Sequence, residues 1–117
     1  MPSVLLVEDE FLIRAVVVDA LDGLNIACIE APSGQKAIDI INGNEPLSVV
    51  IVDIGLPDMS GERVIEAALE RRPAVSIIRC SGAEPGGPVA NPRVHIVAKP
   101  FSAVELAKRV AALVKGS

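Results

Sequence analysis

The fold is decided by an apolar run, Ser48-Val-Val-Ile-Val-Asp53, and by the turn-forming stretch just after it, Gly55-Leu-Pro-Asp-Met-Ser-Gly61. Four β-branched residues in a row predict a strand buried on both faces, which is typical of a parallel sheet covered by helices. Such sheets bind ligands beyond the carboxyl ends of their strands. Asp53 ends this strand, so its carboxylate is a candidate site residue.

Strand-like runs and helical patterns alternate along the chain. Apolar runs predict strands over residues 4–7, 26–29, 49–52, 75–80 and 94–98. Between these runs, apolar residues recur at helical spacing. Helix N-caps are predicted at Ser33 and Ser60, and Ser102 with Glu105 forms a capping box before the last helix. The alternation predicts a single α/β domain, residues 1–117, built on a parallel sheet.

One connection breaks this alternation. Residues 82–93 contain three prolines and three glycines at the place where a crossover helix is expected. Proline and glycine both disfavour a helix interior. We therefore expect the fourth helix to be shortened or replaced by a loop, and long connections of this kind are often functional.

A second group of acids, Glu8, Asp9 and Glu10, follows the first apolar run. In a doubly wound sheet, the first and third strands are neighbours where the winding reverses, so Glu8 and Asp9 are expected to approach Asp53. Carboxylates at close range repel, and at least one pKa rises unless a cation keeps them all ionised. Oxygen ligands in this number suit Mg²⁺.

Composition argues against several classes of function. The chain has 117 residues, half of them apolar and only two aromatic, with a net charge of −4. Nucleic acids are bound by basic surfaces and aromatic stacking, which this chain lacks. No apolar run reaches the roughly 18 residues of a membrane span, and the chain starts without a basic leader. We expect a cytoplasmic protein with no nucleic-acid or membrane partner.

Together, four motifs resemble those of a response regulator receiver domain, the phospho-acceptor module of two-component signalling. They are Glu8-Asp9, Asp53 with Leu56-Pro57 and Gly61, Ser81-Gly82, and Lys99-Pro100-Phe101. The resemblance covers about residues 3–115. It implies a flavodoxin-like, doubly wound, five-stranded parallel sheet of order 2-1-3-4-5, an order taken from the family and not from the residues.

The resemblance assigns a role to each acid. It makes Asp53 the acceptor of a phosphoryl group from phosphohistidine. Asp9 binds Mg²⁺ directly and Glu8 binds it through water, while Asp53 and the backbone carbonyl of Gly55 complete the protein ligands. Glu10 is expected in the first turn of the first helix, where the helix dipole favours an acid, and not as a ligand.

Two further residues are expected to contact the phosphoryl oxygens. The resemblance places the Lys99 ammonium on one oxygen and the Ser81 hydroxyl on another, and Gly82 leaves room for the donor. Phosphorylation adds roughly 1.5 to 2 negative charges, and movement of Ser81 toward them would switch the surface beyond the fourth strand. The peptide bond before Pro100 is a candidate cis bond.

The chain departs from the family at the switch position, where an aromatic residue is usual and Ile96 stands here. The chain has no tyrosine, so we expect residues 82–93 to couple the site to a partner instead. Gly55 and Ala83 occupy the two positions that tune hydrolysis, and neither side chain can hold a water. We therefore predict a long-lived phosphoryl group. We interpret His95 as a partly buried structural histidine.

Cys28 and Cys80 lie in the second and fourth predicted strands. In the implied order these strands are roughly 14 Å apart, which is beyond disulfide reach. We interpret both residues as reduced core thiols.

Three other functions compete with this interpretation. A Mg²⁺-dependent phosphatase with an aspartyl-phosphate would want a second acid where Gly55 stands, and a nucleotide binder would need a glycine-rich or Walker motif. A receiver-like module that binds partners independently of phosphate stays open. Our expectation is a non-enzymatic phospho-acceptor, fed by a sensor histidine kinase or a histidine phosphotransfer protein, that switches contact with a downstream protein. We expect a stand-alone regulator, with excision from a longer protein as the alternative.

Overall fold

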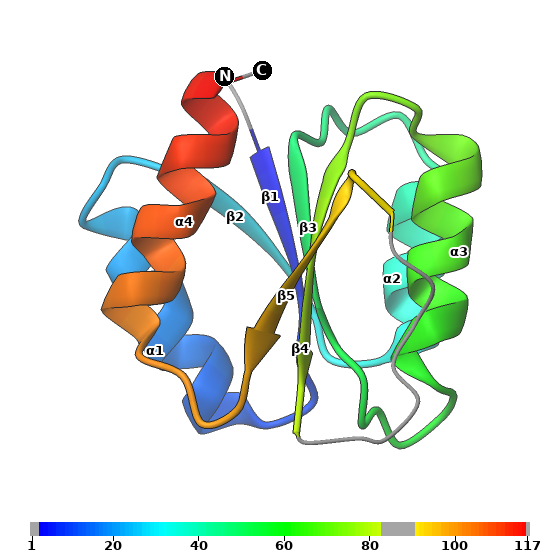
Figure 1. Cartoon of the computed structure of the whole chain (residues 1–117). Helices are drawn as coiled ribbons and strands as arrows, with labels where there is room; N and C mark the ends of the chain where they lie inside the picture. Colours follow the sequence, from blue (N-terminus) through cyan, green and yellow to red (C-terminus); the bar gives the residue numbers. More distant parts are fainter. Residues whose placement is uncertain (1–2, 83–90, 117) are drawn as a thin grey trace.

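The computed structural model describes residues 3–82 and 91–116. A five-stranded parallel sheet lies between two pairs of helices (Figure 1). The strands are β1 (Ser3–Val7), β2 (Ala27–Ala31), β3 (Val49–Asp53), β4 (Ser76–Ser81) and β5 (Val94–Ala98). The helices are α1 (Phe11–Asp22), α2 (Gly34–Ile41), α3 (Gly61–Arg71) and α4 (Ala103–Gly116). The strand order is β2-β1-β3-β4-β5, so the predicted doubly wound architecture is confirmed.

Each face of the sheet has its own apolar core. Helices α1 and α4 cover one face, and α2 and α3 cover the other (Figure 1). Alternate residues of β3 serve the two cores: Val50 and Val52 pack toward α2 and α3, while Val49 and Ile51 pack toward α1 and α4. This division explains why β3 reads as a continuous apolar run, because both of its faces are buried.

The helix starts follow the predicted caps. Ser33 accepts a hydrogen bond from the Lys36 amide, and Ser60 accepts one from the Glu62 amide. The Ser102 hydroxyl accepts a hydrogen bond from the Glu105 amide at 3.3 Å, which is the serine half of the predicted capping box. These caps fix where α2, α3 and α4 begin, and so where the preceding loops leave the sheet.

Four strands differ from the predicted bounds: β1 begins one residue earlier and β3 ends one residue later, while β2 and β4 are displaced along the chain. Strand β2 begins one residue later and extends two residues further than 26–29. The cause is the turn after α1, where Asn25 has a φ of 59° and the Ile26 amide bonds back to the Leu21 carbonyl. Strand β4 is likewise shifted by one residue, to Ser76–Ser81.

The sequence predicted that the helix between β4 and β5 is shortened or replaced by a loop over residues 82–93. Residues 83–90 of that segment lie outside the described residues. Within 3–82 and 91–116, every helix is too short or too polar to cross a lipid bilayer. All five strands run in the same direction, so their carboxyl ends meet at one edge of the sheet, hereafter the carboxyl edge.

Candidate functional site

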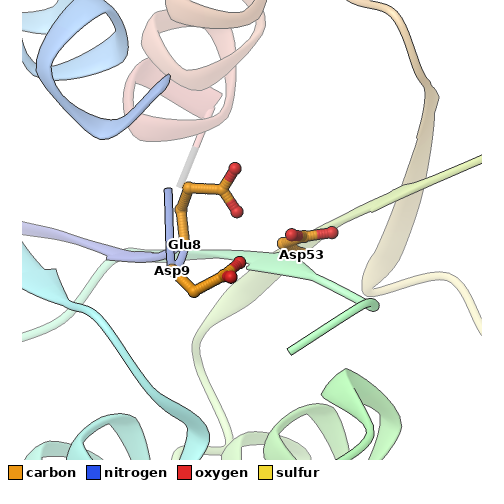
Figure 2. Close-up of side chains that lie close together, drawn as sticks. All are labelled: Glu8, Asp9 and Asp53. Atoms are coloured by element: carbon orange, nitrogen blue, oxygen red, sulfur yellow. The ribbon is translucent and has the colours of Figure 1, made fainter. Parts of the chain in front are cut away.

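Three carboxylates gather at the carboxyl edge. Glu8 and Asp9 follow β1, Asp53 ends β3, and an oxygen from each lies within 4.8 Å of the others. Figure 2 shows the three side chains converging between the ends of these two strands. Glu8 is 3% exposed and Asp53 is 7% exposed, whereas Asp9 is open to solvent. The structure therefore brings together the three acids that the sequence predicted would meet.

Glu8 is the acid of this cluster that is hardest to ionise. Burial, and then the neighbouring Asp53 carboxyl, raise the pKa of Glu8 from its usual 4.5 to about 8. Its Oε2 atom is buried and has no hydrogen-bond partner among the described residues. A buried carboxylate oxygen without a partner is costly, and a cation is the group that would satisfy it.

The Asp53 carboxylate is stabilised in its charged form. Its Oδ1 atom accepts a hydrogen bond from the Lys99 ammonium at 2.5 Å and another from the Gly55 amide at 3.2 Å. Burial opposes ionisation of Asp53, but its interactions with Glu8, Lys99 and Gly55 outweigh burial and lower its pKa. Burial likewise opposes the charge on Lys99, and the carboxylates of Asp53 and Glu8 raise its pKa above the usual value. Asp53 and Lys99 therefore form an ion pair at neutral pH.

The loop after β3 is held against the sheet by Gly61. A Cβ atom at this position would lie 2.6 Å from the Asp53 carbonyl oxygen and 2.7 Å from the Ile54 Cα. Both are backbone atoms, which cannot move aside as a flexible side chain could. Only glycine allows α3 to start this close to Asp53.

Asp58 ties the same loop to a neighbouring helix. Its two carboxylate oxygens accept hydrogen bonds from the Gly34 and Gln35 amides, each at 2.9 Å, at the start of α2. These amides, Gly34 first, lower the pKa of Asp58. The site loop is thus anchored on both sides, at α2 and at α3.

Ser81 ends β4 and is joined to Lys99 through the backbone, because the Lys99 amide donates to the Ser81 carbonyl at 2.9 Å. Its hydroxyl accepts a hydrogen bond from Arg79 at 2.7 Å. The Arg79 guanidinium also donates to both carboxylate oxygens of Glu62, at 3.1 and 3.0 Å. Sequence analysis missed this cluster, although an arginine inside the apolar run 75–80 was a visible signal.

Arg14 positions the acidic pair and was also missed. Its guanidinium donates to the backbone carbonyls of Glu8 and Asp9, at 3.0 and 3.4 Å, and to the Glu30 carboxylate at 3.1 Å. One side chain from α1 therefore fixes the turn that carries two of the three acids. The sequence offered no signal for this, because the contact depends on where the side chain points.

Several smaller expectations can be placed. Glu10 is the N-cap residue of α1, one position before the predicted first turn, and its side chain makes no capping bond. The Lys99–Pro100 peptide bond is cis. His95 is half-buried in β5, whereas Ile96 is 54% exposed. Ala83 lies outside the described residues.

Both cysteines are unpaired thiols. Burial raises the pKa of Cys80 to about 12 and that of the half-buried Cys28 to about 11. Neither thiol is appreciably ionised at neutral pH, which agrees with the interpretation of both as structural residues.

An apolar groove of about 590 Å³ opens beside the ion pair. Its lining includes Leu12 and Val16 of α1, and Lys99, Pro100 and Phe101, which follow β5. Leu12 is 75% exposed and Val16 is 58% exposed, although both are large aliphatic residues. Exposed apolar residues next to a polar site are typical of a protein-docking surface.

The residues present fit a divalent cation. Oxygen ligands from Glu8, Asp9 and Asp53 are the hard donors that Mg²⁺ prefers, and Mg²⁺ commonly takes only one or two carboxylates while keeping several waters. The exposed Asp9 leaves this side of the cluster open to water. The unpartnered Glu8 oxygen is the observation that a cation explains.

Comparison with known proteins places these features in a family. The sequence pattern of the response regulator receiver domain matches residues 4–111. The chain is 32% identical to the sensor kinase CckA of Brucella abortus, with 92% of the chain aligned, and 32% identical to the probable transcriptional regulatory protein TcrX of Mycobacterium tuberculosis, with 97% aligned. It spans 12% and 50% of the length of these two relatives.

Solved structures agree. The receiver domain of the putative LuxO repressor protein of Vibrio parahaemolyticus superimposes with a TM-score of 0.81 at 27% identity, covering 98% of this chain and 91% of that one. The receiver domain of the hybrid histidine kinase CckA gives a TM-score of 0.80 at 26% identity, covering 96% and 98%. Receiver domains act as phospho-acceptors in two-component signalling. With the fold and the acidic pocket, these matches show that the chain belongs to the response regulator receiver domain family.

Proposed function

We propose that Asp53 accepts a phosphoryl group from the phosphohistidine of a sensor kinase or phosphotransfer protein, and that the phosphorylated domain switches its contact with another protein. The observation that carries this proposal is the arrangement around Asp53. Two acids lie on one side of its carboxylate, and the Lys99 ammonium binds its Oδ1 atom at 2.5 Å. The acids would hold a metal cation on one side of the acceptor, and Lys99 supplies a positive charge beside it. Both charges would stabilise a phosphoryl group, which carries negative charge on three oxygens.

The transfer conserves atoms and charge. A carboxylate oxygen of Asp53 attacks phosphorus in line and forms the new O–P bond. The N–P bond to histidine breaks, its electron pair stays on that ring nitrogen, and the donor histidine, protonated on its other nitrogen, leaves as neutral imidazole. The hydrogen bonds from the Gly55 amide and the Lys99 ammonium both go to Oδ1 of Asp53, so Oδ2 is the proposed nucleophile. The lowered pKa of Asp53 keeps that oxygen ionised at neutral pH. Lys99 would then exchange its bond to Asp53 for one to a phosphoryl oxygen.

Glu8, Asp9, Asp53 and the Gly55 carbonyl are the residues proposed to hold Mg²⁺. The bound cation would neutralise charge on the phosphoryl oxygens and remove the repulsion among the acids. In the phosphorylated protein, the Ser81 hydroxyl is proposed to donate a hydrogen bond to a phosphoryl oxygen. Gly55 and Ala83 carry no side chain that could position an attacking water, so slow hydrolysis is part of the proposal.

The groove between α1 and the residues after β5 is the proposed docking surface for the phosphodonor. Its apolar residues Leu12 and Val16 line it together with Lys99 and are therefore close to the acceptor. Residues 1–117 would act as one receiver unit, without enzymatic activity on a separate substrate. A cytoplasmic histidine kinase or phosphotransfer protein is the proposed donor.

Intact-protein mass spectrometry tests the proposal. The wild type and Asp53→Asn are incubated with acetyl phosphate in the presence of Mg²⁺ or of EDTA. We expect one added phosphoryl group on the wild type with Mg²⁺, and none with EDTA or on Asp53→Asn. Equal labelling of Asp53→Asn would place the acceptor elsewhere. A folded wild type that stays unlabelled by acetyl phosphate and by a histidine kinase would favour a phosphate-independent interaction module.

A further inference from the structure

Arg79 is a buried charge in the middle of the sheet. It lies in β4 and is 4% exposed, between neighbours that belong to the apolar cores. Burying a guanidinium costs free energy unless its donors are matched. Two of its nitrogens, Nε and Nη2, donate to Glu62 at the start of α3, and Nη1 donates to the Ser81 hydroxyl oxygen at 2.7 Å. Arg79, Glu62 and Ser81 are hereafter the Arg79 cluster.

The geometry of the Arg79 cluster decides which way the Ser81 hydroxyl can act. A guanidinium has donors and no acceptor, so the Ser81 oxygen must accept in this bond. The single hydroxyl proton of Ser81 therefore cannot be directed at Arg79 and remains available to an acceptor. A hydroxyl that accepts from a cation is also a stronger donor, because hydrogen bonds in a chain polarise one another.

The cluster is also fixed in place. The two-pronged bond from Arg79 to Glu62 orients the guanidinium plane, and Glu62 is held in the first turn of α3 by the Ser60 cap. Across the sheet, Arg79 is paired in register with Ile96 of β5. The Ile96 side chain is apolar and carries no hydrogen-bond acceptor.

We infer that Arg79 is a positioning residue for phosphoryl recognition: it holds the Ser81 hydroxyl as a hydrogen-bond donor for the phosphoryl group on Asp53, and Glu62 orients Arg79. This inference rests on the proposed function, since the acceptor of the Ser81 proton is the phosphoryl group. The described hydrogen bonds of Arg79 go to Ser81 and Glu62, and none of them goes to Asp53. The effect of Arg79 must therefore disappear when the Ser81 hydroxyl is removed.

A double-mutant cycle tests this dependence. Binding of beryllofluoride, a phosphoryl mimic, is measured by ¹⁹F NMR in saturating Mg²⁺ for wild type, Arg79→Met, Ser81→Ala and the double variant. With Ser81 present, we expect Arg79→Met to weaken beryllofluoride binding about fivefold, which is the effect of losing about one hydrogen bond. In the Ser81→Ala background, the same substitution should weaken binding less than about twofold. The fluorine resonance sensitive to Ser81→Ala should shift in Arg79→Met as well.

Two further variants keep the test decisive. Arg63→Met removes an exposed arginine from the same turn of α3 and should bind beryllofluoride like the wild type. Glu62→Gln keeps the guanidinium but weakens its anchor, so it should show a smaller loss that also vanishes with Ser81→Ala. This variant answers the question if Arg79→Met does not fold.

The outcomes separate the inference from the proposed function. If the wild type binds no beryllofluoride and takes up no phosphoryl group, the proposed function fails and the inference fails with it. If the wild type binds and Arg79→Met binds equally well, the inference alone is overturned. Equal losses in both Ser81 backgrounds would also overturn it, because Arg79 would then act through the fold or its charge and not through the hydroxyl.

Discussion

The two edges of the sheet satisfy their polar groups in opposite ways. At the edge where the strands begin, Arg72 donates to the backbone carbonyls of Ile40, Ile41, Gly43 and Glu45 at the end of α2. Arg93 donates to the carbonyls of Leu69, Arg72 and Val75 around the end of α3. Ile40, Ile41 and Leu69 lie in the last turns of their helices, where carbonyls lack the intrahelical amide four residues on. The two arginines bond these carbonyls together with carbonyls of the segments that follow.

At the carboxyl edge the balance is reversed. Three carboxylates share the space beside a single ammonium, that of Lys99, and one buried oxygen of Glu8 has no partner in the part of the chain that is described. The first edge stabilises the fold with its own side chains. The second gathers more acidic groups than its one ammonium can balance, so a proton on Glu8 or a bound cation must balance the rest. The first edge therefore serves stability, and the second has the features of a functional site.

The largest predicted effect comes from Gly61→Ala, which pushes a Cβ into backbone at the carboxyl edge. We expect the free energy of unfolding to fall by about 3 kcal/mol or more, because the Asp53 carbonyl and the start of α3 must separate. Urea unfolding measures the change. Gly82→Ala is the matched control, since a Cβ there meets no atom of the described residues within 4 Å, and a comparable loss in that variant would refute the steric explanation.

Arg72→Met tests the opposite edge. Removing the donor to four carbonyls should lower the free energy of unfolding by roughly 2 to 3 kcal/mol, while Mg²⁺ binding by the folded protein stays unchanged. The exposed neighbour Arg71 bonds only a side chain, that of Asn42, among the described contacts, so Arg71→Met should cost less than about 0.5 kcal/mol. Equal losses for both arginines would break the contrast between the edges.

Glu8→Gln should stabilise the protein in the absence of Mg²⁺, but only at high pH. The pKa of Glu8 is raised in the folded state to about 8, so folding favours its proton. Its contribution is present below the unfolded value near 4.5 and is lost as pH rises through 8. Asp53 has a lowered pKa, and its own contribution is lost only at acidic pH below that window.

Urea unfolding in EDTA at pH 5 and pH 8 measures this effect. We expect Glu8→Gln and the wild type to be similar at pH 5, and the variant to be more stable by about 1 to 2 kcal/mol at pH 8. A difference that does not change with pH would mean that Glu8 does not retain its proton in the folded protein.

Leu12→Ser should have the smallest effect on the molecule and a selective effect on its donor. Leu12 is 75% exposed, so the free energy of unfolding should change by less than about 0.5 kcal/mol. Phosphotransfer from a histidine kinase that labels the wild type should slow about fivefold, since one apolar contact at the docking surface is lost. Labelling by acetyl phosphate is the control and should not change; equal slowing with both donors would argue against docking in the groove.

The sequence predicted the carboxyl edge better than the rest of the molecule. Apolar runs located the strands approximately, and the resemblance to receiver domains supplied their order, so Glu8, Asp9, Asp53 and Lys99 could be placed at one edge of the sheet from the sequence. The position of Ser81 at the end of β4 followed in the same way.

The arginine contacts could not be predicted. Arg14, Arg72, Arg79 and Arg93 act through long side chains that cross to another element, and spacing along the chain does not say where such a side chain points. The start of β2 was misplaced for a related reason, since the turn at Asn25 depends on a bond back to α1 and not on hydrophobic pattern.

The central claim is that Glu8 helps to hold a cation beside Asp53. Its most direct test is the unfolding temperature of the wild type and of Glu8→Gln at pH 8, measured at increasing Mg²⁺ concentrations. If the acids at the carboxyl edge bind a cation, Mg²⁺ should raise the unfolding temperature of the wild type by several degrees and that of Glu8→Gln by clearly less. A wild type whose unfolding temperature does not respond to Mg²⁺, or two proteins that respond identically, would contradict the claim that Glu8 helps to hold a cation beside Asp53.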